Sequence, residues 1–471
     1  MLWHARPTSS PVAANVKIRT ELKAASPPAF SPRRLLQILA HRTSKLALIA
    51  VLLCPVPCII GQDAIRAIPA TRTSPSVDWK YSFGPKPLTG YRQVAPNTPY
   101  AAETGYGFDL GSDIVMVERS ANDPVAAGYA TGKEGKPFFF SVSVPEGNYK
   151  VTVTLGDAAA ASETTVRAEL RRLMVERLRT EPGQFQTRSF IVNVRQPAIA
   201  SGGQVRINAR EQSTEARAWD DLLALEFAGP HAALVSLQIE KVDLPTLWLI
   251  GDSTVCDQPV EPYNSWGQMI TRFFRPNIAV ANHAESGESV AGALSARRFD
   301  KIWSEIRPGD YLFVQFGHND MKSSAPNALE TFTSNLRRIV AETRQRSGVP
   351  VLFTPVSRRT FDSSGKITNS FRGYPDAIKL VASDMNVPLI DLQRSSAKFY
   401  EAMGVEASHQ AFANESEGTH HGDYGSYQIA KSIVQLIKEV KLPITEHLVD
   451  DWKPFDPSHP DPIREFSQSY R

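Results

Sequence analysis

Cysteine is scarce in this sequence, and low-complexity tracts and short-period repeats are absent. Of the three cysteines in 471 residues, Cys54 and Cys58 lie inside an apolar run near the N-terminus, and Cys256 is the third. If that run is removed during export, no internal disulfide can form in the mature chain. The composition, with 42% apolar and 21% charged residues, is that of a soluble globular protein.

A strong net charge is also lacking. The formal charge is +3, but the first 67 residues hold 9 Lys or Arg against 2 Asp or Glu. The rest of the chain holds 43 basic and 47 acidic residues, a balance of about −4. This balance gives no indication of a nucleic-acid partner.

The apolar run at residues 46–60 is too short for an ordinary membrane span. It has 15 residues, is interrupted by Pro55 and Pro57, and follows a basic stretch that ends at Lys45. We therefore predict that residues 1–67 are an export signal, with a retained signal anchor as the alternative. The mature protein is then expected to be periplasmic or secreted, without stable membrane association.

The length favours two domains after this leader. Residues 74–244 contain short alternating segments that predict an all-β sandwich. The expected strands are at 138–144, 148–155, 187–194, 204–208 and 222–227, with a hairpin turn at 145–148. Residues 167–179 fit this pattern less well, because their leucine and arginine content also suits a helix.

Aromatic residues gather near the start of this half, in segments rich in glycine and proline. They are Trp79, Tyr81, Phe83, Tyr91, Tyr100, Tyr106 and Phe108. We expect most of them to fill the sandwich core, and the alternative is that one or two stack on a sugar. Through the segments 81–84 and 105–108, this half resembles the galactose-binding-like modules fused to polysaccharide esterases, which implies a jelly-roll sandwich.

Residues 242–246 separate this half from a second one, in which strand and helix patterns alternate. Strands are predicted at 246–250, 278–282, 311–315, 350–354 and 388–391, and helices at 265–275, 289–306, 329–346, 372–385 and 424–440. Five strands alternating with helices predict a three-layer α/β/α domain with a five-stranded parallel sheet. We place this domain at residues 245–445, followed by a C-terminal extension at 446–471.

The first of these strands ends in a sequence typical of a reactive loop. The apolar residues 247–250 are followed by Gly251, Asp252 and Ser253. In open parallel sheets, reactive groups lie beyond the carboxyl ends of the strands, so we predict Ser253 as a nucleophile. Cys256 lies three residues further on, and we interpret it as a packing residue.

Three further blocks of polar residues follow later strands or precede the last helix, at residues 284–289, 316–320 and 417–425. With Ser253 they bring Gly287, Asn319 and His420 onto separate loops. Acyl transfer needs a nucleophile, a base that removes its proton and donors for the developing oxyanion. The four blocks provide these groups together.

At these residues the chain resembles the SGNH, or GDSL, hydrolase family, most closely the rhamnogalacturonan acetylesterases. The resemblance implies a flavodoxin-like fold and removal of acetyl groups from pectin. It further implies Ser253 as nucleophile and His420 as general base and acid. The backbone N–H groups of Ser253 and Gly287 and the side-chain amide of Asn319 would form the oxyanion hole.

One position departs from the family pattern. Where the family usually has aspartate three residues before the histidine, this sequence has Glu417. Glutamate can still orient an imidazole, so Glu417 is predicted as the third triad member, with Asp423 or a Ser–His dyad as alternatives. His421, next to His420, invites a metal-site interpretation, but neighbouring side chains point apart and no ligand cluster is evident. No metal and no cofactor are expected.

Trp266, His318 and Arg358 are the candidates for substrate binding. Trp266 can line the pocket or pack beneath it, and His318 and Arg358 lie just beyond strand ends, where they can meet a uronic carboxylate. The expected partner is an acetylated polysaccharide or oligosaccharide. Xylan acetyl groups, an aryl ester and a lipid remain alternative substrates, and a carbohydrate-binding protein with an inactive esterase half is an alternative of another class.

Overall fold

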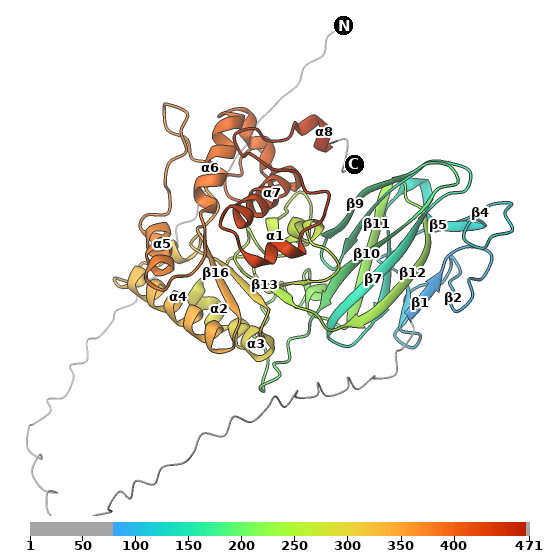
Figure 1. The fold of residues 1–471 in the computed structure, drawn as a ribbon, viewed down its shortest axis with the longest axis horizontal. Coiled ribbons are helices and arrows are strands. Elements are labelled where there is room, and N and C mark those ends of the chain that lie inside the picture. Colours follow the sequence, from blue (N-terminus) through green and yellow to red (C-terminus); the bar gives the residue numbers. More distant parts are fainter. Residues whose placement is uncertain (1–78, 468–471) are drawn as a thin grey trace, which may run out of the picture. The chain divides into compact units, whose positions relative to one another are not determined.

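The computed structural model describes residues 79–467, so the predicted leader at residues 1–67 lies outside the described residues. Three β-sheets form the framework of the described chain (Figure 1). Two are built from residues before 245 and the third from residues after it. No helix among the described residues is long and apolar enough to cross a membrane.

The larger upstream sheet has seven strands (Figure 1). Its main path runs through β10 (Phe185–Val194), β7 (Gly147–Gly156), β12 (Leu234–Val242), β1 (Trp79–Ser82) and β2 (Arg92–Gln93). Off this path, β5 (Gly128–Gly132) pairs with β12 and β4 (Ile114–Glu118). All neighbours are antiparallel except β1 and β2.

The second upstream sheet has five antiparallel strands. In spatial order they are β3 (Tyr106–Asp109), β6 (Phe138–Ser143), β11 (Leu222–His231), β8 (Ser162–Ala168) and β9 (Arg172–Thr180). Apolar side chains of both sheets, such as Val153 and Phe140, form one buried cluster, which is the expected result of alternating patterns on two facing sheets. Short 3₁₀ helices occur at Lys133–Gly135 and Ala216–Ala218.

The N-terminal aromatic residues divide between core and surface. Tyr81, Phe83 and Phe108 are buried in the upstream cluster. Trp79 and Tyr106 pack against it, so five of the seven contribute to this core, as predicted for most of the group. The partly exposed members are Trp79, Tyr91, Tyr100 and Tyr106.

Four of the five predicted upstream strands are confirmed as β6, β7, β10 and β11, but the strand predicted at 204–208 is wrong. Val205 is buried there, in a small cluster with Leu170 and Trp219 rather than in a sheet. The alternating pattern therefore arises because one face of a loop is buried.

The arginine-rich stretch 167–179 is a hairpin of β8 and β9 and not a helix. Its arginines are held by carboxylates on other elements, such as Arg167 by Glu226 and Arg172 by Asp257. Side-chain pairing across elements therefore outweighs the local helical preference.

The downstream sheet has five parallel strands, as predicted (Figure 1). Their order is β14 (Ala279–Asn282), β13 (Thr246–Gly251), β15 (Tyr311–Gln315), β16 (Val349–Phe353) and β17 (Leu389–Ile390). β13 carries Ser253 just beyond its end and lies between β14 and β15. All of its residues are buried, which explains its continuous apolar sequence.

Helices pack against both faces of this sheet. They are α1 (Trp266–Met269), α2 (Val290–Ser295), α3 (Arg298–Glu305), α4 (Ala328–Gln345), α5 (Tyr374–Asp384), α6 (Leu392–Met403), α7 (Asp423–Glu439) and α8 (Ile463–Ser467). Leu247 and Leu249 join a cluster with α1, α6 and α7, whereas Trp248 and Ile250 join one with α3, α4 and α5. The alternation of side chains along β13 thus serves two separate cores.

Two predicted helices differ from the structure. The helix predicted at 265–275 is α1 followed by a 3₁₀ helix, Ile270–Phe273. The helix predicted at 289–306 is divided into α2 and α3, because Arg297 between them has a left-handed backbone with φ of 64°. Further 3₁₀ helices are at Asp320–Lys322, Ala407–Ala411 and Pro443–His447.

Candidate active site

The turn after β13 holds Ser253 at the carboxyl edge of the downstream sheet. The carboxylate of Asp252 accepts hydrogen bonds from the backbone N–H of Thr254 at 3.0 Å and from its hydroxyl at 2.8 Å. Gln258 donates to the carbonyl of Ser253 at 2.7 Å. The turn is therefore held from both sides, and Asp252 acts within it as a structural residue.

Ser253, His420 and Glu417 form one hydrogen-bonded series. The Oγ of Ser253 lies 2.8 Å from Nε2 of His420, and Nδ1 of His420 lies 3.0 Å from Oε2 of Glu417. His420 and Glu417 belong to the loop that precedes α7. This series provides a path by which a hydroxyl proton can pass to an imidazole whose far side faces a carboxylate.

The second carboxylate oxygen of Glu417 fixes the loop itself. Oε1 accepts the backbone N–H groups of Gly418, Thr419 and His420 at 3.0, 2.8 and 3.2 Å. Burial alone would raise the pKa of Glu417, but hydrogen bonds from His420 and the backbone hold it below its ordinary value. Glu417 is therefore kept ionised opposite the imidazole.

Asp423, the predicted alternative to Glu417, lies in another set of contacts. Its carboxylate accepts from Asn264 at 2.7 Å and lies 3.3 Å from Arg171. Of the two carboxylates, the structure places Glu417 against His420.

The three predicted oxyanion donors lie around the same cavity as Ser253. Within residues 79–467, the backbone N–H groups of Ser253 and Gly287 donate to no protein acceptor. Gly287 has φ of 79°, and a Cβ built there meets nothing within 4 Å, so backbone conformation and not crowding favours glycine. Asn319 donates from Nδ2 to the carbonyl of Glu288 at 2.9 Å and accepts from Lys322 at 2.7 Å, which fixes the orientation of its amide.

The cavity has a volume of about 510 Å³. Its lining comprises Arg210, Thr214, Glu215, Ser253, Gln258, Pro259, Val260, Tyr263, Ser286, Gly287, Asn319, Lys322, Glu417 and His420. The serine, the imidazole and the candidate donors thus share one open space.

The three residues predicted to bind substrate lie outside this lining. The side chain of Trp266 is 1% exposed, stacks on Phe353 and donates to Gln315 at 2.9 Å, so of its two predicted alternatives the structure shows packing beneath the pocket. His318 is 2% exposed with its ring edge-on to Phe371, and burial lowers its pKa to about 4. A neutral, enclosed imidazole cannot meet a uronic carboxylate.

Arg358 is partly exposed but also turns away from the cavity lining. Its Nη2 donates to the carbonyl of His318 at 3.2 Å, and its guanidinium lies over the ring of Phe371. In the described structure it holds the loop after β15, and it lines no wall of the cavity around Ser253.

Several residues of the lining had no signal in the sequence. Ser286 lies within the recognised block 284–289, and Gln258 is five residues after Ser253, so these two had an indirect signal in the sequence. Arg210, Thr214 and Glu215 come from the connection between β10 and β11 of the upstream half, about 40 residues before Ser253 in the sequence. No local pattern marks that connection as part of a site.

His421 and Cys256, both neighbours of the site in sequence, point into the protein interior. His421 is buried, with Nε2 2.6 Å from the hydroxyl of Tyr400, and its ring stacks on Phe412. Burial raises the pKa of the Cys256 thiol well above its ordinary value, which is unsuited to a nucleophile. Within the described range, no three His, Cys, Asp or Glu side chains are grouped so that they could hold a metal ion.

Ser253 lies beyond a parallel strand, in series with an imidazole and a carboxylate and beside free N–H groups. This arrangement defines the class of serine-dependent esterases. The chain belongs to the GDSL-like lipase/acylhydrolase family, whose sequence profile matches residues 249–426. It is thus a carboxylic ester hydrolase. Residues 79–186 match the family described as beta-agarase/YXIM esterase-like, galactose-binding domain-like.

Two of the relatives are proteins of Bacillus subtilis. The chain is 36% identical to the rhamnogalacturonan acetylesterase RhgT over 217 residues, which cover 43% of this chain and 94% of RhgT. It is 27% identical to the uncharacterized esterase YxiM over 404 residues, covering 81% of this chain and 94% of YxiM. The crystal structure of YxiM aligns with a TM-score of 0.43 at 24% identity, over 78% of this chain and 99% of that one.

Proposed function

We propose that this protein is an exported carbohydrate esterase that removes O-acetyl groups from rhamnogalacturonan. The observation that carries the proposal is the series of contacts at 2.8 and 3.0 Å from Ser253 through His420 to Glu417. The 36% identity to a rhamnogalacturonan acetylesterase supports the choice of substrate. The predicted leader at residues 1–67 supports export to the periplasm or medium.

In the proposed reaction, Oγ of Ser253 attacks the acetyl carbon while its proton passes to Nε2 of His420. The negative charge on the carbonyl oxygen is accepted by the N–H groups of Ser253 and Gly287 and by the Asn319 amide. Collapse of this intermediate returns the proton to the sugar oxygen, which leaves as a hydroxyl. Water then attacks acetyl-Ser253 and gives a proton to His420. His420 returns this proton to Oγ of Ser253 as the bond to the acyl carbon breaks, and acetate departs.

Glu417 is assigned a supporting part in this scheme. Its carboxylate holds the imidazole through Nδ1 and stabilises the imidazolium that forms when the Ser253 proton is taken up. The three backbone hydrogen bonds to its other oxygen keep it in place throughout.

We also propose the finer architecture that accompanies this activity. The two clusters on opposite faces of the downstream sheet support a three-layer α/β/α, flavodoxin-like domain at residues 245–445. The shared cluster of the two upstream sheets supports a jelly-roll sandwich at residues 74–244. Residues 446–471 would form an extension after the catalytic domain.

The test is acetate release from acetylated rhamnogalacturonan, acetylated xylan and a long-chain ester. We expect the highest kcat/KM on rhamnogalacturonan and no release by Ser253→Ala on any substrate. A preference for xylan or for the long-chain ester would refute the proposed substrate and keep the esterase. Sugar binding without hydrolysis of any ester would refute the esterase mechanism.

A further inference from the structure

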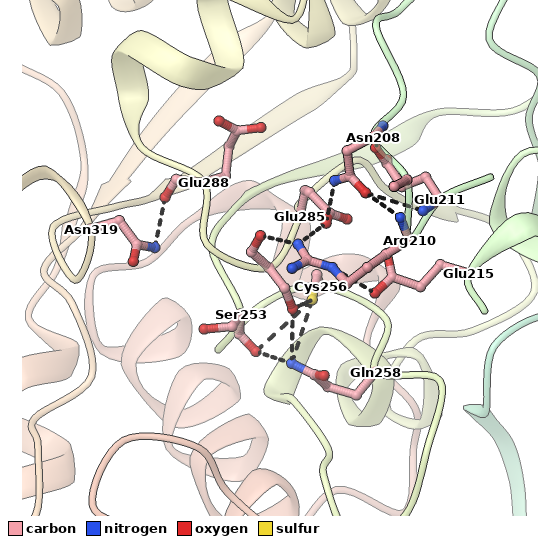
Figure 2. A network of polar contacts seen from close by, with 12 residues as sticks. Asn208, Arg210, Glu211, Glu215, Ser253, Cys256, Gln258, Glu285, Glu288 and Asn319 are labelled. Atoms are coloured by element: carbon pink, nitrogen blue, oxygen red, sulfur yellow. Dashed lines mark hydrogen bonds and ion pairs between the residues drawn. The ribbon is translucent and has the colours of Figure 1, made fainter. Parts of the chain in front are cut away.

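Part of the cavity lining is supplied by the upstream half of the chain. The connection between β10 and β11 contributes Arg210, Thr214 and Glu215 to the lining. The mechanism proposed above uses none of them. Of the three, Arg210 makes the most direct contacts with the downstream loops (Figure 2).

Arg210 contacts the loop that carries Gly287 through two different groups. Its Nη2 lies 2.5 Å from Oε1 of Glu285 and 2.5 Å from the backbone carbonyl of Ser286. On the other side, its Nε lies 3.5 Å from Glu215. Figure 2 shows the guanidinium between the Glu285 and Glu215 side chains. Although the Arg210 side chain is 52% exposed, its charged end is held on two sides.

The connection that carries Arg210 is itself firmly anchored. Glu211 receives two parallel hydrogen bonds from Arg298 of α3, both at 2.8 Å, and both side chains are buried. Asn208 accepts the backbone N–H of Arg210 at 2.8 Å and donates to Glu285 at 2.8 Å. Bidentate pairing of this kind fixes geometry as well as charge, so Arg210 is presented from a defined position.

The carbonyl of Ser286 matters because of the peptide unit to which it belongs. The C=O of Ser286 and the N–H of Gly287 are parts of one planar trans peptide and point in opposite directions. A donor that holds the carbonyl therefore sets the direction of the N–H. Gly287 can adopt many backbone conformations, so without such a contact this peptide could rotate.

We propose that Arg210 is a positioning residue of the esterase site, which holds the Ser286–Gly287 peptide so that the Gly287 N–H faces the acyl oxygen. The inference rests on the proposed function, because it assumes that Gly287 serves as an oxyanion donor. It makes the upstream half a part of the active site in addition to any separate sugar-binding role.

A second role for Arg210 predicts different kinetics. A half-exposed guanidinium in the cavity could instead bind a carboxylate of the substrate. Loss of substrate binding raises KM for the charged polysaccharide alone. Loss of an aligned oxyanion donor acts in the transition state, so it lowers kcat for every acetyl ester, charged or not.

The experiment compares Arg210→Ala with the parent enzyme on 4-nitrophenyl acetate and on acetylated rhamnogalacturonan. We expect kcat to fall about 10- to 100-fold on both substrates, with KM changed less than about twofold, because a donor is misaligned and not removed. Added guanidinium ion should restore part of kcat. A kcat within about twofold of the parent, or a rise in KM confined to the polysaccharide, would overturn the inference.

Two further variants keep the test valid if Arg210→Ala folds poorly. Arg210→Lys keeps the charge but not the planar fork, and should lose kcat to a smaller extent. Glu285→Gln weakens the contact between Arg210 and Glu285 from the Glu285 side. Its effect on kcat should be less than additive with that of Arg210→Ala, because both variants disturb the same contact. The proposed role of Arg210 would be contradicted if the effects of Arg210→Ala and Glu285→Gln on kcat were fully additive. It would also be contradicted if both Arg210→Lys and Glu285→Gln kept the kcat of the parent.

Arg217→Ala is the matched control. Arg217 lies on the same connection, but it pairs with Asp109 of the upstream half at 2.5 Å and lines no part of the cavity. Its loss should lower stability and leave kcat within about twofold, so an equal fall in kcat would overturn the inference. Ser253→Ala separates the two proposals: if it retains activity, the mechanism fails, whereas if it is inactive and Arg210→Ala is normal, only the present inference fails.

Discussion

The two walls of the cavity differ in how they are built. On the downstream wall, Ser253, Gly287, Asn319 and His420 each lie on a loop next to a strand or helix of the parallel sheet. On the upstream wall, Arg210 and Glu215 extend from a connection between two upstream strands, and Arg210 contacts the downstream residue Glu285. The comparison suggests that one wall holds the reacting groups and the other fixes their orientation.

The largest effect is expected on the downstream wall, from removal of the hydroxyl. Ser253→Ala should reduce kcat by about 10⁴-fold or more, because no acyl-enzyme can form. Cys256→Ala should keep more than about a tenth of the activity, since its thiol is buried and protonated. Acetate release measures both, and an inactive Cys256→Ala with an active Ser253→Ala would reverse the assignment of the nucleophile.

The next effect concerns the two carboxylates near His420. Glu417→Gln should lower kcat by about 10²- to 10⁴-fold, because a neutral amide cannot stabilise the imidazolium. Asp423→Asn should stay within about threefold, because Asp423 contacts Asn264 and Arg171 instead. Initial rates on 4-nitrophenyl acetate give the comparison, and similar losses in the two variants would show that both carboxylates support the imidazole.

The attachment of the upstream half to the downstream half is tested by stability. Asp257 accepts two hydrogen bonds from Arg172 of β9, at 2.9 and 2.7 Å, and both side chains are buried. Asp257→Ala should lower the free energy of unfolding by about 3–5 kcal/mol, because it leaves a buried cation without its partner. Asp243→Ala breaks an exposed pair with Arg307 and should cost about 0–1 kcal/mol. Denaturant titration measures the free energy of unfolding of both variants. Equal losses would mean that the buried pair contributes no more to stability than the exposed pair.

The smallest expected effect is on the pH dependence of stability, and it arises from Glu215. Burial and the neighbouring Glu285 raise the pKa of Glu215 from 4.5 to about 8. Between these two values the folded protein keeps a proton that the unfolded chain has released, so stability falls as the pH rises. Glu215→Gln should remove this fall and gain on the order of 1–2 kcal/mol relative to the parent at pH 8.5, with little gain at pH 4. Thermal unfolding across this range measures it, and parallel curves for variant and parent would contradict the raised pKa.

Much of the downstream half was predictable because its signals are local. The apolar residues of β13 and the polar block after them identify a buried strand and a reactive loop from adjacent residues. The division between α2 and α3 was not predictable, because it depends on the left-handed backbone of Arg297 in a stretch that otherwise suits a helix. Helix α6 and several upstream strands were likewise not predicted.

The residues of the candidate site likewise divide into those that the local sequence indicates and those that it does not. That Ser253, His420 and Glu417 lie together could be expected from the order of their blocks and from the resemblance to the SGNH family. The presence of Arg210 in the cavity could not be predicted, because it depends on folding that brings the connection between β10 and β11 to a loop about 75 residues away in the sequence. The position of Trp266 stayed open between two alternatives, because an aromatic residue at a helix start can face either the core or the pocket, and only packing decides which.

The buried charge pairs between the two halves have a consequence for shortened enzymes. A polypeptide beginning near residue 245 would contain Arg298 and Lys301, each 1% exposed, but not their partners Glu211 and Glu146. Its α3 would then hold these two cations with one carboxylate partner each, Glu288 for Arg298 and Glu305 for Lys301, and with their buried ends opened to water. An industrial version lacking the first domain would therefore need compensating substitutions along α3 before its expression yield or heat tolerance could match those of the intact protein.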